Sequence, residues 1–370
     1  MKYPISIIGL LGLSLAPRAQ STATLSTLPT ITINLRTPDP LATGAFNHFE
    51  VIDQRADTAR IGIHTFIPTF GHSRNRQLIF RQPVASEIAG YLNKSFARPG
   101  AHWSALIVLR NLWLSDANYL REDKVKDPEV MTHRTHIRLK AEIYAYNDSF
   151  YVPIIRFDTL QTYKRSNPYN NWNSYYSLWE NDLTAVLTGM TDSASSLTLI
   201  RAERGRRLQL DEIRQFNRSR FDPAITGSVS PVPGVYASFQ EFRDNTPSIQ
   251  SFEVRQEKDG RLLYVKDKNG ASQYCHDAWG YCDGKTIFIM REGRLFPVWK
   301  EGKAFYFYSQ AYKEWTMQDL QVVTPTPSVI TPTGRLIPGS PGGFYPGPTR
   351  KVPSLQQRIY TVDMDSGGVY

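Results

Sequence analysis

Histidine and cysteine pairs are the first places to look for chemistry in this sequence. His133 and His136 lie three residues apart, a spacing that would put both on one face of a helix. They enter a segment with the alternation of a β-strand, however, where an odd spacing sends two side chains to opposite faces. Cys275, Cys282 and His276 lack a convincing fourth ligand for zinc. We therefore expect no metal site and no cofactor.

Carboxylates are plentiful, but nothing in their spacing pairs them for acid–base catalysis. The sequence also lacks the zinc-protease, nucleophile-elbow, P-loop and dinucleotide-binding motifs. A catalytic site assembled from distant parts of a fold leaves no local trace, so a hydrolase with a composite site is one alternative. We expect instead a protein that is not an enzyme.

The first twenty residues have the order of a secretory signal peptide. Lys2 precedes an apolar run at 5–15, and small residues lead to a predicted cleavage before Gln20. An apolar run of this length is too short for a transmembrane helix, which needs about 20 residues, and no later segment is long and apolar enough. No cysteine near the cleavage site can take a lipid anchor. We expect an exported protein, periplasmic or extracellular and not lipid-anchored.

Export would place Cys275 and Cys282 in an oxidising compartment, where two thiols can pair. The six residues between them suit the two arms of a hairpin. A single extended strand would instead hold the Cα atoms beyond the roughly 4.4–6.8 Å that a disulfide needs. A disulfide and two buried free thiols therefore both remain open.

An excess of arginine marks residues 201–220, where seven arginines face three acidic residues. The segment is interpreted as a basic connecting helix or extended arm. Such a surface can bind nucleic acid, anionic lipid head groups or an acidic partner, although a solvated helix is the simpler interpretation. An exported protein rarely meets nucleic acid, so we expect no nucleic-acid partner. The candidate anionic-partner surface comprises Arg201, Arg204, Arg206, Arg207 and Arg214.

Aromatic residues concentrate between positions 296 and 315. On a strand, Phe305 and Phe307 face one way while Tyr306 and Tyr308 face the other. Either set can pack into a core, and plain packing is the simpler interpretation for the phenylalanine set and the tyrosine set alike. The set that contains the tyrosines is the candidate surface for a glycan or a protein partner. It comprises Tyr306, Tyr308, Tyr312 and Trp315.

A polar corner, Asp53-Gln54-Arg55-Ala56-Asp57, follows an extended run. It could be a polar site at a strand end. Alternatively, Asp53 or Asp57 pairs with Arg55 or accepts backbone N–H groups at a turn, and we favour this structural interpretation.

The hydrophobic pattern predicts an α+β fold in which an antiparallel sheet carries helices on one face, over residues 46–200. Alternation is clearest at 136–145, and a turn at 147–149 leads to a returning strand at 151–162. Apolar residues three to four apart predict helices at 83–96 and 175–190. Further strands are expected at 30–35, 49–55 and 105–114.

A small antiparallel β-meander domain is expected at 234–322, because Asp-Gly, Asn-Gly, Glu-Gly and similar turns separate short alternating runs. Ser238 is the expected N-cap of a helix at 239–245, with Glu241 completing a capping box. The other predicted segments are a signal peptide (1–19), an N-terminal extension (20–45), the basic arm and linker (201–233), a flexible Pro/Gly-rich segment (323–353) and a last strand and turn (354–370).

The order of these elements over residues 30–200 resembles the YajG-type lipoproteins of the bacterial envelope. The matching features are the strand ending in Asp53-Gln54-Arg55, the helix ending before Pro99-Gly100, the strand at 105–114, the hairpin at 136–162 and the helix at 175–190. The resemblance implies an envelope-associated protein without established enzymatic activity. Membrane tethering does not carry over, because the lipid-acceptor cysteine is missing. Residues 234–370 resemble a β-rich segment of uncharacterised exported bacterial proteins, through the stretch at 278–285.

Composition sets the outer limits of function. With 370 residues, 41% apolar and 21% charged, the chain is long enough for two domains and is neither wholly disordered nor a disulfide scaffold. Its formal charge of +9 becomes +7 once Lys2 and Arg18 are removed. We expect a non-enzymatic envelope or extracellular accessory protein with an envelope protein partner, and peripheral membrane contact is allowed. Glycan binding by the aromatic set is the alternative.

Overall fold

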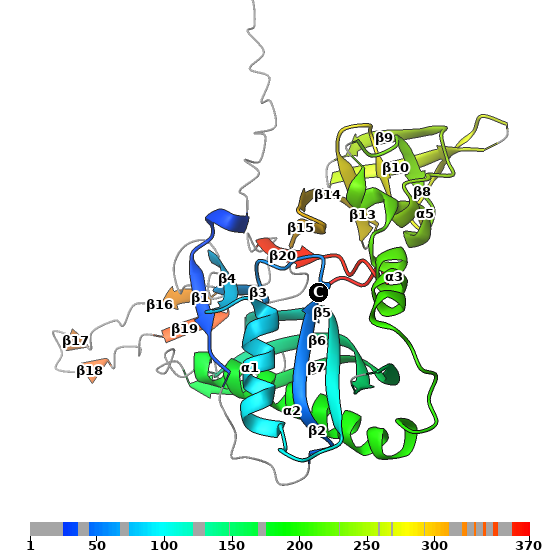
Figure 1. Cartoon of the computed structure of the whole chain (residues 1–370). Coiled ribbons are helices and arrows are strands. Elements are labelled where there is room, and N and C mark those ends of the chain that lie inside the picture. Colours follow the sequence, from blue (N-terminus) through cyan, green and yellow to red (C-terminus); the bar gives the residue numbers. More distant parts are fainter. Residues whose placement is uncertain are drawn as a thin grey trace, which may run out of the picture.

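The computed structural model describes residues 25–35, 44–66, 74–120, 130–147, 149–168, 175–228, 230–257, 260–267, 269–291, 293–310, 320–323, 329–330, 336–337, 343–346 and 357–370. Their main body consists of two β-sheets with helices around them (Figure 1). The fold class is α+β, as predicted.

The first sheet contains seven strands in the order β1-β4-β3-β5-β6-β7, and β2 also pairs with β5. Parallel pairs (β1 with β4, and β2 and β3 with β5) stand beside antiparallel ones, so the sheet is mixed. The strands are β1 (Thr30–Ile33), β2 (Phe46–Asp53), β3 (Gly62–Phe66), β4 (Arg74–Phe80), β5 (Trp103–Leu120), β6 (Val130–Tyr146) and β7 (Tyr151–Pro168).

Two helices, α1 (Val84–Phe96) and α2 (Tyr175–Arg201), cover one face of this sheet. Their apolar stripes pack on the alternate residues of β5 and β6, such as Ile107 and Leu139, in one buried cluster. A third helix, α3 (Leu210–Phe221), lies in the segment expected to be a basic arm. Its Ile213 packs against Leu106, Val108 and Tyr144 on the opposite face.

The second sheet is entirely antiparallel, in the order β20-β15-β14-β13-β12-β8. Its strands are β8 (Gly234–Tyr236), β12 (Gly280–Cys282), β13 (Ile287–Arg291), β14 (Arg294–Glu301), β15 (Ala304–Gln310) and β20 (Gln357–Thr361). The three-stranded sheet beside it comprises β9 (Phe252–Glu257), β10 (Gly260–Lys266) and β11 (Ser272–Tyr274). Tight turns after short strands produce this meander, as their residue types predict.

Two short helices precede or enter this meander, α4 (Ala224–Gly227) and α5 (Phe239–Asp244). The Ser238 side chain caps α5, accepting a hydrogen bond from the Glu241 N–H at 3.3 Å. The Glu241 carboxylate accepts from the Ala237 N–H at 2.8 Å, one residue before the position of an ideal capping box.

The Pro/Gly-rich segment departs from the prediction where it is described. We expected too many prolines and glycines for paired strands, yet two short antiparallel pairs form. They are β16 (Leu320–Val323) with β19 (Gly343–Pro346), and β17 (Val329–Ile330) with β18 (Leu336–Ile337). The one proline within these strands, Pro346, is the last residue of β19.

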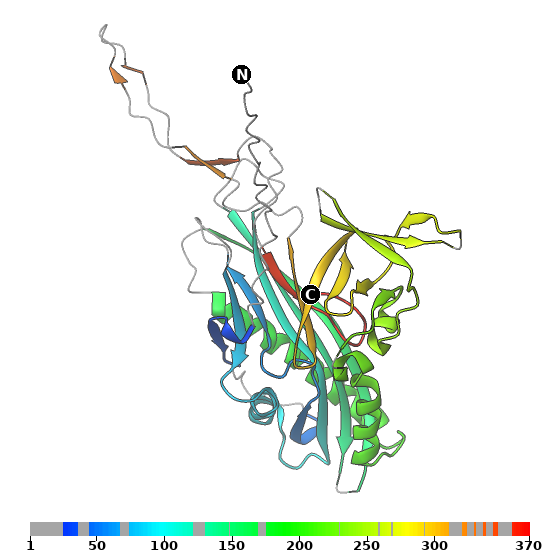
Figure 2. The same ribbon diagram turned by 90° about the horizontal axis from the view of Figure 1, so that it is seen from above.

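The two sheets meet along β15 and β20, which lie beside β3 and β5 (Figures 1 and 2). An apolar cluster joins them, with Ile63 and Trp113 from the first sheet and Ala304, Tyr306 and Ile359 from the second. Leu25, in the 3-10 helix η1 (Leu25–Thr27), completes the cluster.

Candidate functional site: a charged cavity between the two sheets

The site begins with an irregularity in β5. Its pairing with β6 passes from Leu109 opposite Ala141 to Asn111 opposite Lys140, so Arg110 is an extra residue, a β-bulge. The bulge shifts the alternation by one. Leu109 and Leu112 therefore both enter the helix-covered core, while Arg110 faces the opposite side of the sheet.

The polar corner crosses the edge of β5 at this bulge. The chain leaves the sheet where the Gln54 N–H donates to the Leu109 carbonyl at 2.8 Å, and it returns where the Leu114 N–H donates to the Ile61 carbonyl at 2.7 Å. A Cβ atom on Gly62 would lie 1.9 Å from the Leu114 carbonyl oxygen, so only glycine allows this return. The bulge and the corner together leave an opening in the sheet edge.

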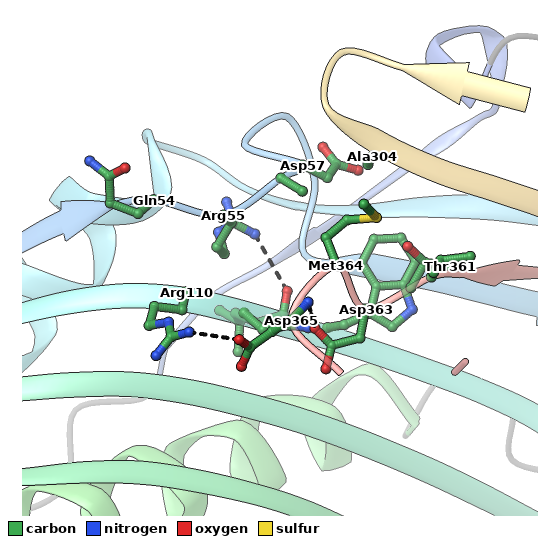
Figure 3. A pocket seen from close by; sticks show the side chains of 14 residues that line it. Gln54, Arg55, Asp57, Arg110, Ala304, Thr361, Asp363, Met364 and Asp365 are labelled. Atoms are coloured by element: carbon green, nitrogen blue, oxygen red, sulfur yellow. Dashed lines mark hydrogen bonds and ion pairs between the residues drawn. The ribbon is translucent and has the colours of Figure 1, made fainter. Parts of the chain in front are cut away.

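A cavity of about 50 Å³ occupies this opening. It is lined by residues 54–57 of the corner, 110–113 of β5, Ala304 of β15, Thr361 at the end of β20 and residues 362–365 after it (Figure 3). Pockets for drug-sized ligands measure roughly 300–1,000 Å³, so this one suits a few water molecules or a small ion.

Buried cations of the first sheet hold the acidic residues that follow β20. Arg110 donates to Asp365 at 3.0 Å, a contact drawn in Figure 3, and to Glu142 of β6 at 3.0 Å. The Lys140 ammonium of β6 contacts Asp363 and lies 3.2 Å from Asp365. Lys140 is only 3% exposed. Buried charges of this kind are tolerated because each has an opposite charge beside it.

Glu142 is the anionic centre on the sheet itself. Besides Arg110, it accepts hydrogen bonds from Arg156 of β7 at 2.8 Å and from the Tyr144 hydroxyl at 2.9 Å. Burial and the neighbouring Glu142 charge raise the pKa of Tyr144 above its ordinary value. The Tyr144 hydroxyl therefore keeps its proton and donates a hydrogen bond to Glu142 over the whole physiological pH range.

Asp363 is the anionic centre of the C-terminal segment. It contacts Lys140 and accepts hydrogen bonds from the hydroxyls of Ser366 and Tyr370, both at 2.7 Å. Burial pushes its pKa upward, but Lys140 and the two hydroxyls outweigh burial, and the net pKa lies below the ordinary value. The carboxylate thus stays ionised at neutral pH.

The corner residues form a structural network of their own. Arg55 makes a two-pronged ion pair with Asp53, with both N–O distances 2.9 Å, and donates to the Arg60 carbonyl at 2.8 Å. Asp57 accepts the backbone N–H groups of Ala59 at 2.9 Å and Arg60 at 3.2 Å. These contacts are the ion pair and the turn that the structural interpretation of the corner describes. Arg55 and Asp57 nevertheless line the cavity, and Asp53 lies next to the lining residue Gln54.

The aromatic candidates divide between interior and half-buried positions. Tyr306 is fully buried, and its hydroxyl donates to Asp57 across the junction, so it contributes nothing to an exposed platform. Tyr308 is half-buried, with its ring 4.8 Å from that of Trp299. Tyr312 and Trp315 lie outside the described residues. A glycan platform on this set therefore stays a prediction for those three positions alone.

The five candidate arginines are exposed and lie away from the cavity. They occupy the end of α2, the turn after it and the start of α3. Arg201 donates to the Ile154 carbonyl at 2.7 Å, and the Arg207 guanidinium lies 4.3 Å from the centre of the Phe150 ring. Arg206 and Arg214 each lie 3.5 Å from an acidic residue of α3.

Both cysteines are free thiols in the structure. Cys282 is buried in β12, where its sulfur accepts the Gly284 N–H at 3.2 Å, and Cys275 is partly exposed. Burial raises the pKa of the Cys282 thiol, which disfavours the reactive thiolate.

The described residues contain neither a cluster of metal ligands nor a helix suited to a membrane. No three histidine, cysteine or carboxylate side chains in that part of the chain come together as a metal site would require. No helix there has the length and apolar character needed to cross a bilayer.

The sequence did not single out the cavity-lining residues of β5 and the C-terminal segment, nor Lys140 and Glu142 of β6, which pair with them. One signal was visible: Arg110 interrupts the otherwise apolar run at 105–114, and a charge there requires a partner. Its partner Asp365 carries no signal in the sequence, because it lies 255 residues further along the chain.

Comparisons with known proteins add little to this picture. No family model and no curated protein matches the chain. Among solved structures, a Xanthomonas campestris protein assigned to the family DUF330 is 15% identical and covers 44% of this chain and 91% of its own, with a TM-score of 0.24. A second, uncharacterised protein is 7% identical and covers 46% of this chain and 99% of its own, with a TM-score of 0.20. Scores this low carry neither fold nor function across, and the YajG-type resemblance stays a prediction.

Proposed function

We propose that this chain is an exported, non-enzymatic accessory protein of the cell envelope that acts by binding a protein partner. The observation that carries the proposal is that the buried charges at the candidate site pair with one another. Arg110 and Lys140 pair with Glu142, Asp363 and Asp365 of the same chain, and the adjoining cavity has room for no more than a few water molecules.

Acid–base catalysis needs a group whose pKa lies near the working pH. The pKa of Asp363 is lowered, away from neutral pH, so its carboxylate is a poor base. The pKa of Tyr144 is raised, so its hydroxyl keeps its proton. These groups favour a structural role, in which the C-terminal segment fastens the second sheet to the polar face of the first. Partner binding then falls to the exposed surfaces of the joined body.

Export is tested by locating the full-length chain in a bacterial host. We expect the protein outside the cytoplasm, with Gln20 as its first residue by mass spectrometry. As a matched control, Leu11→Arg places a charge in the apolar run and should leave the protein uncleaved in the cytoplasm. Uncleaved wild-type protein in the cytoplasm would contradict the proposal.

Partner binding is tested by cross-linking the exported protein in whole cells. We expect one envelope protein to be captured by the wild type and by Glu142→Gln, because Glu142 is buried within the junction. A purified chain that stays monomeric and captures nothing would count against binding. Turnover of a hydrolase substrate by the wild type but not by Glu142→Gln would replace the proposal with the composite-site enzyme.

A further inference from the structure

The last turn of α2 exposes two neighbouring aliphatic side chains. Leu199 is 81% exposed and Ile200 is 66% exposed, the two highest values among the large apolar residues described. The buried face of α2 runs through Ala194, Thr198 and Ala202 instead. With about 100° between successive residues, positions 199 and 200 point away from the sheet.

This exposure belongs to a firmly packed corner rather than to a fraying helix end. The backbones of Leu208 and Tyr151 exchange two hydrogen bonds, of 2.8 and 2.9 Å, which fix the chain to β7. Gly205 packs so closely on β7 that an added Cβ atom would lie 2.2 Å from a methyl carbon of Val152. Since both sides of the turn are fixed, Leu199 and Ile200 are held outward.

Four arginines follow the two aliphatic residues within seven positions of the sequence. Arg201, Arg204, Arg206 and Arg207 are all exposed, against the single acid Glu203 in the same stretch. The Arg206 side chain is 77% exposed, and its nearest described acid, Glu212, is 3.5 Å away. Arginine forms two-pronged hydrogen bonds with phosphate, so this set suits a phosphate-bearing surface.

We propose that this corner docks on the surface of an anionic phospholipid membrane. Leu199 and Ile200 enter the head-group region, and Arg201, Arg204, Arg206 and Arg207 contact lipid phosphates. We call these six residues the α2 corner. The proposal concerns a surface remote from the cavity and does not depend on which protein partner the chain binds.

Charge complementarity favours an anionic membrane over a second copy of the chain or an acidic peptide. A second copy of the chain would bring arginines against arginines, which repel. An acidic peptide would satisfy the arginines but leave two adjacent aliphatic side chains without an apolar surface to enter. An anionic bilayer satisfies both, because phosphates lie directly above a hydrocarbon layer.

The test uses the purified full-length protein and two kinds of lipid vesicle, phosphatidylcholine alone and phosphatidylcholine mixed with phosphatidylglycerol. Sedimentation should show binding to the mixed vesicles only, and added salt should weaken it. Leu199→Ser/Ile200→Ser should weaken binding about tenfold. Arg204→Gln/Arg206→Gln/Arg207→Gln should weaken it more, at roughly fivefold per arginine.

A matched control is Leu160→Ser on β7, which removes another exposed aliphatic side chain, 47% exposed, outside the α2 corner. It should bind like the wild type. Equal binding to neutral vesicles, or no binding to either kind, would overturn the proposal. So would wild-type protein that binds an immobilised polyglutamate peptide but not vesicles, or that dimerises in a manner abolished by Leu199→Ser/Ile200→Ser. None of these outcomes bears on export or on capture of an envelope partner.

Discussion

The two faces of the first sheet are built from the same strands but are closed in different ways. One face alternates through Ile137, Leu139 and Ala141, and helices α1 and α2 cover it with apolar side chains. The alternate residues Arg138, Lys140 and Glu142 lie on the other face, which is closed mainly by polar contacts. Lys140 pairs with Asp363, Glu142 pairs with Arg110, and the Arg138 guanidinium lies over the Tyr370 ring.

The difference teaches what each kind of burial requires. Apolar burial stabilises roughly in proportion to area, whichever apolar atoms provide it. A buried charge is tolerated only while its specific partner is in place. The helix-covered face should therefore lose stability by degrees when its residues are altered, whereas the charged face should respond to whether a pair is kept or broken.

The largest effect should come from breaking one pair on the charged face. Lys140→Met keeps most of the side-chain volume but leaves Asp363 and Asp365 without that cation, so we expect a loss of about 3–5 kcal/mol in the free energy of unfolding. Adding Asp363→Asn removes one of the stranded charges and should recover part of the loss. Urea denaturation measures both. A double variant that loses the sum of the two single losses would show that the residues act independently.

The neighbouring residue tests the apolar face. Leu139→Ala should lower the free energy of unfolding by about 3 kcal/mol, because apolar burial is lost and a cavity is left behind. This difference from the wild type should be the same at every pH between 3 and 7. The same denaturation experiment at several pH values checks this. A marked pH dependence would mean that the two faces are not energetically separate.

A smaller effect is expected from protonation of Asp363. Because its pKa is lower in the folded state, its contribution is complete above the unfolded value of about 4 and is lost as the pH falls through the folded pKa. Asp363→Asn should lack this loss on acidification, although it is less stable than the wild type at neutral pH. Parallel stability curves for the two proteins below pH 5 would contradict the assignment.

The smallest effect concerns a single hydroxyl. Tyr144→Phe removes one of the three side chains that donate hydrogen bonds to Glu142 while the two arginines remain, so we expect a loss of about 1 kcal/mol. Thermal unfolding monitored by circular dichroism resolves a change of this size. A loss as large as that of Lys140→Met would mean that Glu142 depends on the hydroxyl rather than on the arginines.

Sequence periodicity predicted the parts of the fold that local pattern controls. The strand at 136–145, its return at 151–162 and the helix at 83–96 were all found, and the meander followed its turn residues. Strands β3 and β4 were missed, because segments such as Gly62–Phe66 are short and contain polar residues at both alternations.

The charged site could not be predicted in the same way. Alternation shows which residues share a face, but not what covers that face. Lys140 and Glu142 therefore looked like solvent-facing residues, and they are 3% and 4% exposed. The bulge at Arg110 had no marker beyond the charge itself, since a β-bulge needs no special residue type.

The ion pair between Lys140 and Asp363 also bears on the time course of folding. The β6–β7 hairpin joins residues close in sequence, which meet early, whereas Asp363 lies 223 residues beyond Lys140. Before the C-terminal segment packs on β6, we expect the Lys140 ammonium and the polar face of the sheet to remain hydrated. Contacts made this late govern how long the folded chain persists rather than how fast it forms.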